Sequence, residues 1–347
     1  MHNLRLPKIS IIIPVYNGEK YIRNTLDSIK KQIFQDYEVL CINDSSIDKS
    51  IEILKEYNLQ DTRFRYYNTE YNLGIVPKVI NYALPLAKGE YYVYSSQDDL
   101  FSEDWLNCMY KRAIETNADA VIPDVVLYHQ YSPQKNKILS GINGDKSIVL
   151  SNRDAFIYSL DWTIPGNALW RLNLIKKIGY YDFSMNADEY SARVFFLNCN
   201  KVVFSCGTFF YRQDNPSAIT KKFSIKMFDI PFTDFKLWEL AKKHEFNMYV
   251  QLNLISKSIR ELLKYNSYTL FGKHKTAKEK IYKCYQAYQD NKISTYLWNQ
   301  NTNSVYLESI ITYKYTLFYA FTVLFWFKRI LLYLLRTFHH ILHFHRN

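Results

Sequence analysis

Short apolar runs alternate with amphipathic stretches along the first third of the chain. The runs with strand length are 9–15, 37–43, 64–68, 90–96 and 118–124, and the stretches with helical periodicity are 18–33, 47–57, 75–88 and 103–115. A repeated order of strand, helix and strand predicts a mostly parallel, Rossmann-like α/β sheet with right-handed crossovers, flanked by helices. In such sheets ligands bind where the strands end, so the polar residues that follow each apolar run are candidates for a site.

The pattern changes after this region. Residues from about 124 to 220 mix strand-like and helical pieces less regularly, and 221–312 show helical spacing of Lys, Tyr and Leu with few Gly or Pro. We therefore expect the α/β region to be followed by a helical C-terminal region. The remaining segment, 313–347, is aromatic and cationic and is considered separately.

The charge of the chain could suggest a nucleic-acid binder, because its 347 residues carry a formal net charge of +11. The basic residues near the C-terminus, however, are embedded in aromatic and aliphatic sequence, which suits an anionic lipid surface better than a nucleic-acid groove. The five cysteines are scattered and form no CxxC pair, so no disulfide framework is needed and a reducing cytoplasm fits best. We expect no nucleic-acid partner.

The segment 313–347 is nearly long enough to span a bilayer. Lys328 and Arg329 fall near its middle, where each charge costs about 2.5 to 3.5 kcal/mol on insertion scales. Lying in the membrane interface would let these charges reach water while the Phe, Trp and Leu side chains sink into lipid. An interfacial anchor on an anionic membrane is thus favoured over a spanning or re-entrant segment and over an ordinary buried pair of helices.

Polar residues follow the first three predicted strands. The first turn holds a single glycine, Gly18, whereas a dinucleotide-binding fingerprint needs three, so hydride chemistry on NAD is not expected. After the second strand, Asp44 can accept hydrogen bonds from a ribose or base, although Asp44 or Ser46 could instead cap the next helix. After the third strand, Asn72 is followed by Gly74, which can supply a positive-φ turn close to a ligand.

The fourth strand runs directly into Gln97, Asp98 and Asp99. Adjacent carboxylates repel one another unless a cation lies beside them, and Mg²⁺ or Mn²⁺ prefers carboxylate and phosphate oxygens. This favours a divalent metal site at Asp98 and Asp99, with capping of the following helix by Asp99 or Ser102 as the alternative. A second acidic pair, Asp188 and Glu189, fits either a general base or an acidic helix N-terminus.

Taken together in this order, the motifs resemble the family 2 glycosyltransferases, an inverting group with the GT-A fold. The resemblance covers residues of about 8 to 220. It is carried by SIIIPVYNGEKYIRNTLDSI, YEVLCINDSSIDKS, the NLG segment leading into INYALPLAKGEYYVY, SSQDD, ADEY, and the ending at 211–217, YRQDNPS, which is similar to the YR…N..S of the family.

The resemblance implies roles for individual residues. The nucleotide pocket would be lined by Pro14, Tyr16, Asn17 and Glu19, with Asp44 on the base or ribose. Asp98 would hold the last acidic position of the DxD-type metal motif, with Asp99 beside it. Asp188 would be the catalytic base, with Glu189 as its rival.

The chain departs from the family pattern at two of these motifs. Ser96 replaces the first acid of the metal motif, which removes one charge from the site. The late acidic pair reads Asp-Glu rather than the commoner Glu-Asp, so the choice of base between Asp188 and Glu189 stays open.

From the resemblance we expect a metal-dependent hexosyl- or N-acetylhexosaminyltransferase that uses a nucleoside diphosphate sugar, by family habit a UDP-sugar. The catalytic domain would be 1–220, with a nucleotide-sugar half of about 1–123 and an acceptor half of about 124–220, followed by the helical region 221–312 and the membrane-associating tail 313–347. The acceptor would be a glycan or a lipid-linked molecule of bacterial surface polysaccharide or lipopolysaccharide synthesis, at the cytoplasmic side of the inner membrane.

The sequence also admits two alternative functions. A sugar nucleotidyltransferase shares a related sheet, but it normally has a basic, Gly-rich loop after the first strand, and PVYNGEKY matches that poorly. A non-catalytic peripheral membrane protein could also keep this fold, because fold alone does not prove activity.

Overall fold

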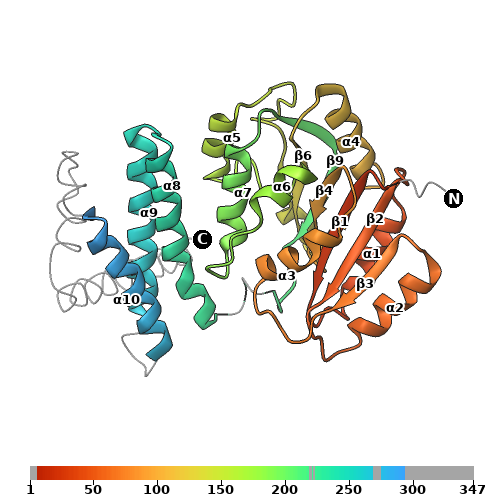
Figure 1. The fold of residues 1–347 in the computed structure, drawn as a ribbon, viewed down its shortest axis with the longest axis horizontal. Coiled ribbons are helices and arrows are strands. Elements are labelled where there is room, and N and C mark those ends of the chain that lie inside the picture. Colours follow the sequence, from red (N-terminus) through yellow and green to blue (C-terminus); the bar gives the residue numbers. More distant parts are fainter. Residues whose placement is uncertain (1–5, 219–220, 222, 269–274, 294–347) are drawn as a thin grey trace, which may run out of the picture. The chain divides into compact units, whose positions relative to one another are not determined.

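The structure is a computed structural model that describes residues 6–218, 221, 223–268 and 275–293 (Figure 1). The chain divides into two compact units. The first unit is formed by Met1–Phe183 and Ala187–Lys222, and the second by Ser184–Asn186 and Phe223–Asn347.

The first half of the first unit has the predicted alternation of strands and helices (Figure 1). Four parallel strands lie in the order β3-β2-β1-β4, and the helices between them form the crossovers. The strands are β1 (Ile9–Val15), β2 (Tyr37–Asn43), β3 (Phe64–Asn68) and β4 (Tyr91–Tyr94), and the helices are α1 (Ile22–Lys30), α2 (Ser50–Gln60), α3 (Val76–Ala83) and the 3-10 turn η1 (Leu84–Leu86). Every residue of β2 is buried, as expected for a parallel strand covered on both faces.

The second half of the first unit continues the same sheet with mixed strand directions. Within the described residues the sheet has nine strands in the order β3-β2-β1-β4-β8-β6-β9-β5, with β7 paired to β6. The added strands are β5 (Leu100–Phe101), β6 (Ala120–Tyr128), β7 (Lys137–Leu139), β8 (Leu169–Arg171) and β9 (Val202–Arg212). The added helices are α4 (Trp105–Thr116), η2 (Pro133–Lys135), α5 (Asn152–Ser159), α6 (Leu172–Ile178) and α7 (Ala187–Leu197). The expected α/β class is confirmed, with parallel pairing concentrated at the N-terminal strands.

Two hydrophobic layers enclose this sheet. Helices α1, α2 and α4 pack on one face through residues such as Leu26, Leu54 and Leu106. Helices α3, α5, α6 and α7 cover the other face, with Ile80 and Phe195 among the buried side chains. Both faces of the central strands are therefore dry, and their polar groups can meet solvent only where the strands end.

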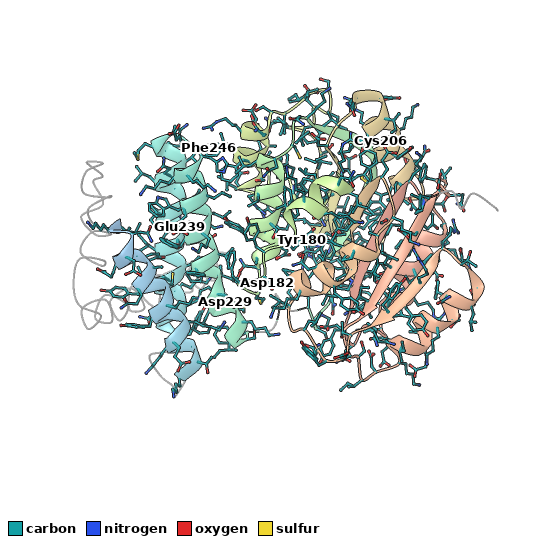
Figure 2. The ribbon with its side chains drawn as sticks, viewed as in Figure 1. Tyr180, Asp182, Cys206, Asp229, Glu239 and Phe246 are labelled. Carbon is teal, nitrogen blue, oxygen red and sulfur yellow. A yellow bond between two sulfur atoms is a disulfide. The ribbon has the colours of Figure 1, made fainter. Side chains whose placement is uncertain are left out.

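One pair of cysteines forms a disulfide, although the scattered cysteines of the sequence predicted no disulfide framework. Cys108 of α4 and Cys206 of β9 are joined by a disulfide although 98 positions separate them in the sequence, and Cys206 is labelled in Figure 2. The pairing of β6 with β9 shifts register after Ile122, and Cys206 lies exposed on this irregular part of β9. The packing of α4 against β9 brings the two thiols together, and no spacing pattern in the sequence could have indicated it.

The second unit is helical, as expected for the C-terminal region. It contains η3 (Ile225–Asp229), α8 (Ile230–Lys243), α9 (Met248–Ser267) and α10 (Lys275–Asp290). Buried aromatic side chains, including Phe235 and Trp238 of α8, form its core. The hydroxyl of Ser258 in α9 is hydrogen-bonded to that of Tyr288 in α10 (2.6 Å), which links these two helices.

Among the described residues, no helix combines the length and the apolar character that crossing a bilayer requires. The predicted anchor at 313–347 lies outside the described residues.

Candidate functional site

The loops after β1 and β2 meet at one edge of the sheet, because Val15 and Asn43 end neighbouring strands in register. The backbone N–H of Asn17 donates to the hydroxyl of Ser46 (3.0 Å), and the side-chain oxygen of Asn17 accepts from the N–H of Ile47 (2.9 Å). The structure thus brings together Asn17 and Ser46, two residues predicted to bind the nucleotide. Their hydrogen bonds fix the shape of the edge where a ligand would bind.

Glu19 strengthens the same junction. Its N–H donates to Asp48 (3.0 Å), and its carboxylate accepts from the backbone N–H of Lys49 (3.0 Å). The neighbouring Tyr16 side chain is exposed, and Pro14 is partly buried near the end of β1. The Tyr16 ring is therefore open to a ligand.

Gln97 connects this edge to the loop after β4. Its side-chain oxygen accepts from the backbone N–H of Tyr16 (2.9 Å), and its side-chain nitrogen donates to the Tyr16 carbonyl (3.1 Å). A Cβ atom at Gly18 would lie 2.4 Å from the side-chain oxygen of Gln97, so a larger residue there would have to displace the Gln97 side chain. Gln97 thus holds the loop after β1 close to Asp98 and Asp99, the acidic pair that follows Gln97 in the chain.

Asp44 is buried and organises the loop after β3. Its carboxylate accepts from the backbone N–H of Leu73 (2.8 Å) and from the hydroxyl of Thr69 (3.1 Å), while Asn72 donates to the Asp44 carbonyl (3.0 Å). These contacts differ from the alternative in which Asp44 caps the next helix, since α2 begins only at Ser50. Gly74 has a φ of +84°, which confirms the predicted positive-φ turn.

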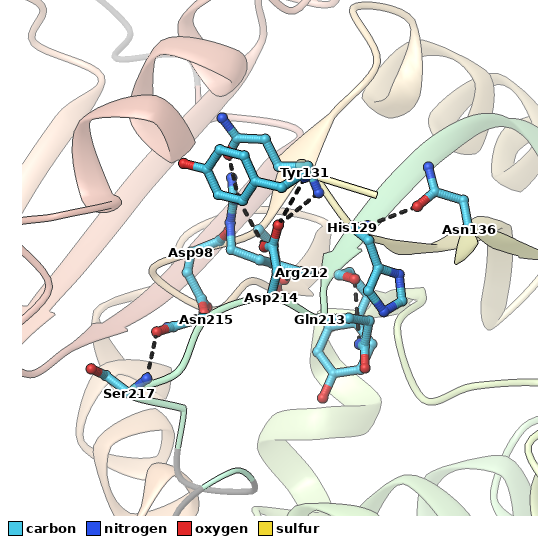
Figure 3. Close-up of polar contacts among 12 residues, drawn as sticks. Asp98, His129, Tyr131, Asn136, Arg212, Gln213, Asp214, Asn215 and Ser217 are labelled. Carbon is cyan, nitrogen blue, oxygen red and sulfur yellow. Dashed lines mark hydrogen bonds and ion pairs between the residues drawn. The ribbon is translucent and has the colours of Figure 1, made fainter. Parts of the chain in front are cut away.

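The acidic pair after β4 has two different environments. Asp98 is partly buried, and its carboxylate accepts from the side-chain amide of Asn215 (2.7 Å; Figure 3). Asp99 is buried, and its two oxygens accept from the backbone N–H groups of Ser96 (3.3 Å) and Arg212 (3.1 Å). Neither carboxylate caps α4, because no side chain makes a cap hydrogen bond at the start of that helix.

Burial raises the pKa of both carboxyls, and the adjacent negative charge of Asp98 raises the pKa of Asp99 further. A buried Arg212 moderates this effect. Its guanidinium donates to the backbone carbonyl of Asp98 (2.8 Å) and lies over the ring of Tyr21, with the cationic carbon 4.9 Å from the ring centroid. The carboxylate of Asp98 itself is held by the neutral amide of Asn215, so a metal ion would not have to displace a cation from it.

The second acidic pair lies in the first turn of α7, where the helix dipole favours negative charge. The two carboxylates are treated differently here as well. Glu189 forms an ion pair with Arg193 one helical turn later, and the guanidinium also donates to the carbonyl of Ser159 (2.5 Å). Burial raises the pKa of Asp188 to about 7, and the charge of Glu189 adds to that shift.

Two tyrosines lie within range of the charges of both acidic pairs. Burial raises the pKa of Tyr211 above its usual range, and the negative charges of all four carboxylates add to this shift. Burial also raises the pKa of Tyr94, at the end of β4, and the negative charges of Asp188 and Asp99 add to that shift. The fold therefore brings residues 98–99 and 188–189 to one region around Tyr211, although about ninety residues separate them in the sequence.

Sequence reasoning assigned no role to the residues that hold this region together. Arg212 and Asn215 contact the first pair, and Arg193 contacts the second. The signals were present in part, because 211–217 resembles the ending common in the family, and Glu189 and Arg193 have the i,i+4 spacing of a helical ion pair. Which carboxylate each residue would contact depended on the fold.

Comparison with known proteins yields consistent matches. Residues 10–215 match the family model described as glycosyl transferase family 2. The glycosyltransferase GlyG of Streptococcus pneumoniae serotype 4 is 27% identical over 228 residues, which are 62% of this chain and 74% of that protein. A poly(ribitol-phosphate) beta-glucosyltransferase of Bacillus spizizenii is 35% identical over 117 residues, 33% of this chain but only 18% of that protein.

Among solved structures, residues 1–349 of S. aureus TarS in complex with UDP-GlcNAc superpose with a TM-score of 0.60 at 18% identity, over 81% of each chain. This likeness confirms the expected GT-A-type architecture: a mixed sheet between helices, followed by a helical C-terminal region.

Proposed function

This chain belongs to glycosyl transferase family 2, and we propose that it moves a hexosyl or N-acetylhexosaminyl group from a UDP-sugar, with inversion, onto a glycan or lipid-linked acceptor. The observation that carries the proposal is the match of residues 10–215 to the family model, and the two acidic pairs, whose charges all act on Tyr211, agree with it. A similarly folded protein binds UDP-GlcNAc, which supports the choice of donor class.

The donor would bind at the edge formed by the loops after β1, β2 and β3. Asp44 would face the base or ribose, and Tyr16 offers an exposed ring beside it. Asn17, Glu19 and Ser46 hold the loops in place through the hydrogen bonds described above. Asn72 does the same through the Asp44 carbonyl, and Gln97 orients the turn so that the diphosphate can approach the acidic pair.

The residues after β4 fit a divalent cation, Mn²⁺ or Mg²⁺. Asp98 would hold the ion directly, because its carboxylate is partly exposed and bound by an amide rather than by a cation. Asp99 would support it from the buried side, where two backbone N–H groups already orient its oxygens. Such an ion, when bound, neutralises the charge that develops on a departing diphosphate.

Asp188 would act as the general base. The acceptor hydroxyl oxygen forms a bond to the anomeric carbon of the donor while the bond from that carbon to the phosphate oxygen breaks. The electron pair leaves with the nucleoside diphosphate, and the hydroxyl proton passes to Asp188. A carboxylate whose pKa is near 7 is a stronger base than an ordinary aspartate, whereas Glu189 is committed to Arg193.

The setting of the reaction is proposed from relatives and from sequence. The acceptor would belong to bacterial surface polysaccharide or lipopolysaccharide synthesis, and a relative that glucosylates poly(ribitol-phosphate) supports the first of these. The aromatic, cationic sequence of 313–347 supports peripheral binding to the anionic cytoplasmic face of the inner membrane.

A panel of nucleotide sugars incubated with the full chain and Mg²⁺ or Mn²⁺ tests the proposal. We expect release of a nucleoside diphosphate from one UDP-sugar, dependent on the metal and abolished by chelation. Release of pyrophosphate from a nucleoside triphosphate, or no turnover of any nucleotide sugar, would contradict it.

A further inference from the structure

Trp162 is an unusual residue in the loop between α5 and β8. It has a φ of +67°, in the left-handed region that bulky side chains rarely adopt. Its neighbours hold it there, since the N–H of Ile164 donates to the Tyr158 carbonyl (3.0 Å) and the N–H of Thr163 donates to Asp161 (2.9 Å). Backbone strain of this kind concentrates at binding and catalytic sites.

The indole lies beside Tyr211. Its ring stacks on Tyr211, with centroids 6.2 Å apart and planes inclined by 30°. Arg193 connects the start of this loop to helix α7, because it donates to the Ser159 carbonyl and also forms an ion pair with Glu189. Trp162 therefore belongs to the same cluster as the proposed base.

Core packing does not explain this tryptophan. Trp105, Trp170 and Trp238 are at most 2% exposed, whereas Trp162 keeps part of its surface in solvent. An aromatic ring that is held rigidly and is partly open offers a flat apolar surface at low entropic cost.

We propose that Trp162, backed by Tyr211, is the platform on which the acceptor binds as a pyranose ring. The apolar C–H face of a sugar stacks on such a ring, while its hydroxyls stay free to reach a base. Trp162 would thereby position the attacking hydroxyl toward Asp188 without taking part in proton transfer. This inference rests on the proposed glycosyl transfer, whose donor half it leaves unchanged.

The full chain with Trp162→Gly tests the platform. Glycine adopts a positive φ without strain, so the variant loses the ring but not the backbone conformation, and its melting temperature should stay close to that of the wild type. Trp162→Phe keeps an aromatic face. Tyr249→Ala removes an aromatic side chain that is 74% exposed in the second unit and serves as the matched control.

Two measurements separate the acceptor from the donor. Saturation-transfer NMR with methyl β-glycosides of glucose, galactose and N-acetylglucosamine should show signal on the ring C–H protons for the wild type, Trp162→Phe and Tyr249→Ala. Trp162→Gly should lose that signal. In this variant the rate of sugar transfer to the glycoside should fall on the order of tenfold or more, whereas the rate of donor hydrolysis should stay within about twofold of the wild type.

The possible results distinguish failure of the acceptor platform from failure of the proposed glycosyl transfer. If no methyl pyranoside binds the wild type, or if Trp162→Gly binds as well as the wild type, the platform is wrong even though donor hydrolysis persists. If the wild type hydrolyses no nucleotide sugar, the proposed function itself has failed. If Trp162→Gly loses donor hydrolysis together with acceptor binding, Trp162 acts on the whole site and the specific role is overturned.

Discussion

The two acidic pairs of the first unit are alike in sequence and unlike in their surroundings. Each consists of adjacent carboxylates, but Asp98 is bound by an amide and Asp99 by backbone N–H groups, whereas Glu189 is paired with a guanidinium. Asp188 has a pKa raised to about 7, mainly by burial. The partners of each carboxylate, rather than the carboxylates themselves, make the first pair suited to binding a cation and the second pair suited to accepting a proton.

The largest effect should come from Asp188→Asn. The amide keeps the shape of the side chain but cannot accept the proton of the acceptor hydroxyl, so kcat for transfer should fall roughly 10²- to 10⁴-fold. Donor affinity, measured by calorimetry with UDP and Mn²⁺, should stay nearly the same. Glu189→Gln is the matched control, and if it lost as much turnover as Asp188→Asn the two residues of this pair would not differ as argued.

Asp98→Asn should act on metal rather than on proton transfer. The asparagine oxygen can still accept from Asn215, so the loop should keep its fold while the site loses the charge that attracts a cation. We expect the apparent affinity for Mn²⁺ in the turnover assay to fall about 100-fold. Asp145→Asn, at an exposed turn, is the control. If Asp98→Asn kept the metal dependence of the wild type, the first acidic pair would not be the metal site.

The sequence was sufficient for the parts of this site that follow from strand order. Apolar runs predicted β1 to β4, the edge where their loops meet, and the position of residues 97–99 after β4. The positive φ of Gly74 was also predictable, because glycine after a strand suits such a turn. These features depend on local pattern and on one general rule about parallel sheets.

The rest depended on contacts between distant segments. Nothing local in the sequence indicates that the N–H of Arg212 reaches Asp99, 113 positions earlier, or that Cys108 meets Cys206. The left-handed backbone of Trp162 was equally hidden, since bulky residues carry no preference for it. The sequence could name the acidic residues, but their individual chemistry is set by neighbours that only the folded chain supplies.

Asp99→Asn should sharpen the contrast within the first pair. Both carboxylate oxygens of Asp99 accept backbone N–H groups, and the amide nitrogen of asparagine cannot accept. One buried N–H would lose its partner, which should lower the free energy of unfolding by about 1–3 kcal/mol in urea denaturation. In the turnover assay, the folded fraction of Asp99→Asn should have an apparent affinity for Mn²⁺ closer to that of the wild type than Asp98→Asn has. A variant as stable as the wild type would show that these two hydrogen bonds contribute little.

The smallest effect should come from Arg193→Met, which leaves the charge of Glu189 without its partner. A less compensated negative charge beside Asp188 disfavours the ionised form, so the pKa of Asp188 should rise. Because the base must be deprotonated, the activity of the wild type should increase with pH through about 7, and the midpoint of kcat/KM for Arg193→Met should move upward by about one pH unit. The double variant Arg193→Met/Glu189→Gln removes both charges and should return the midpoint toward that of the wild type. A merely structural role for Arg193 would lower activity at every pH without moving the midpoint, and the double variant would then give no recovery.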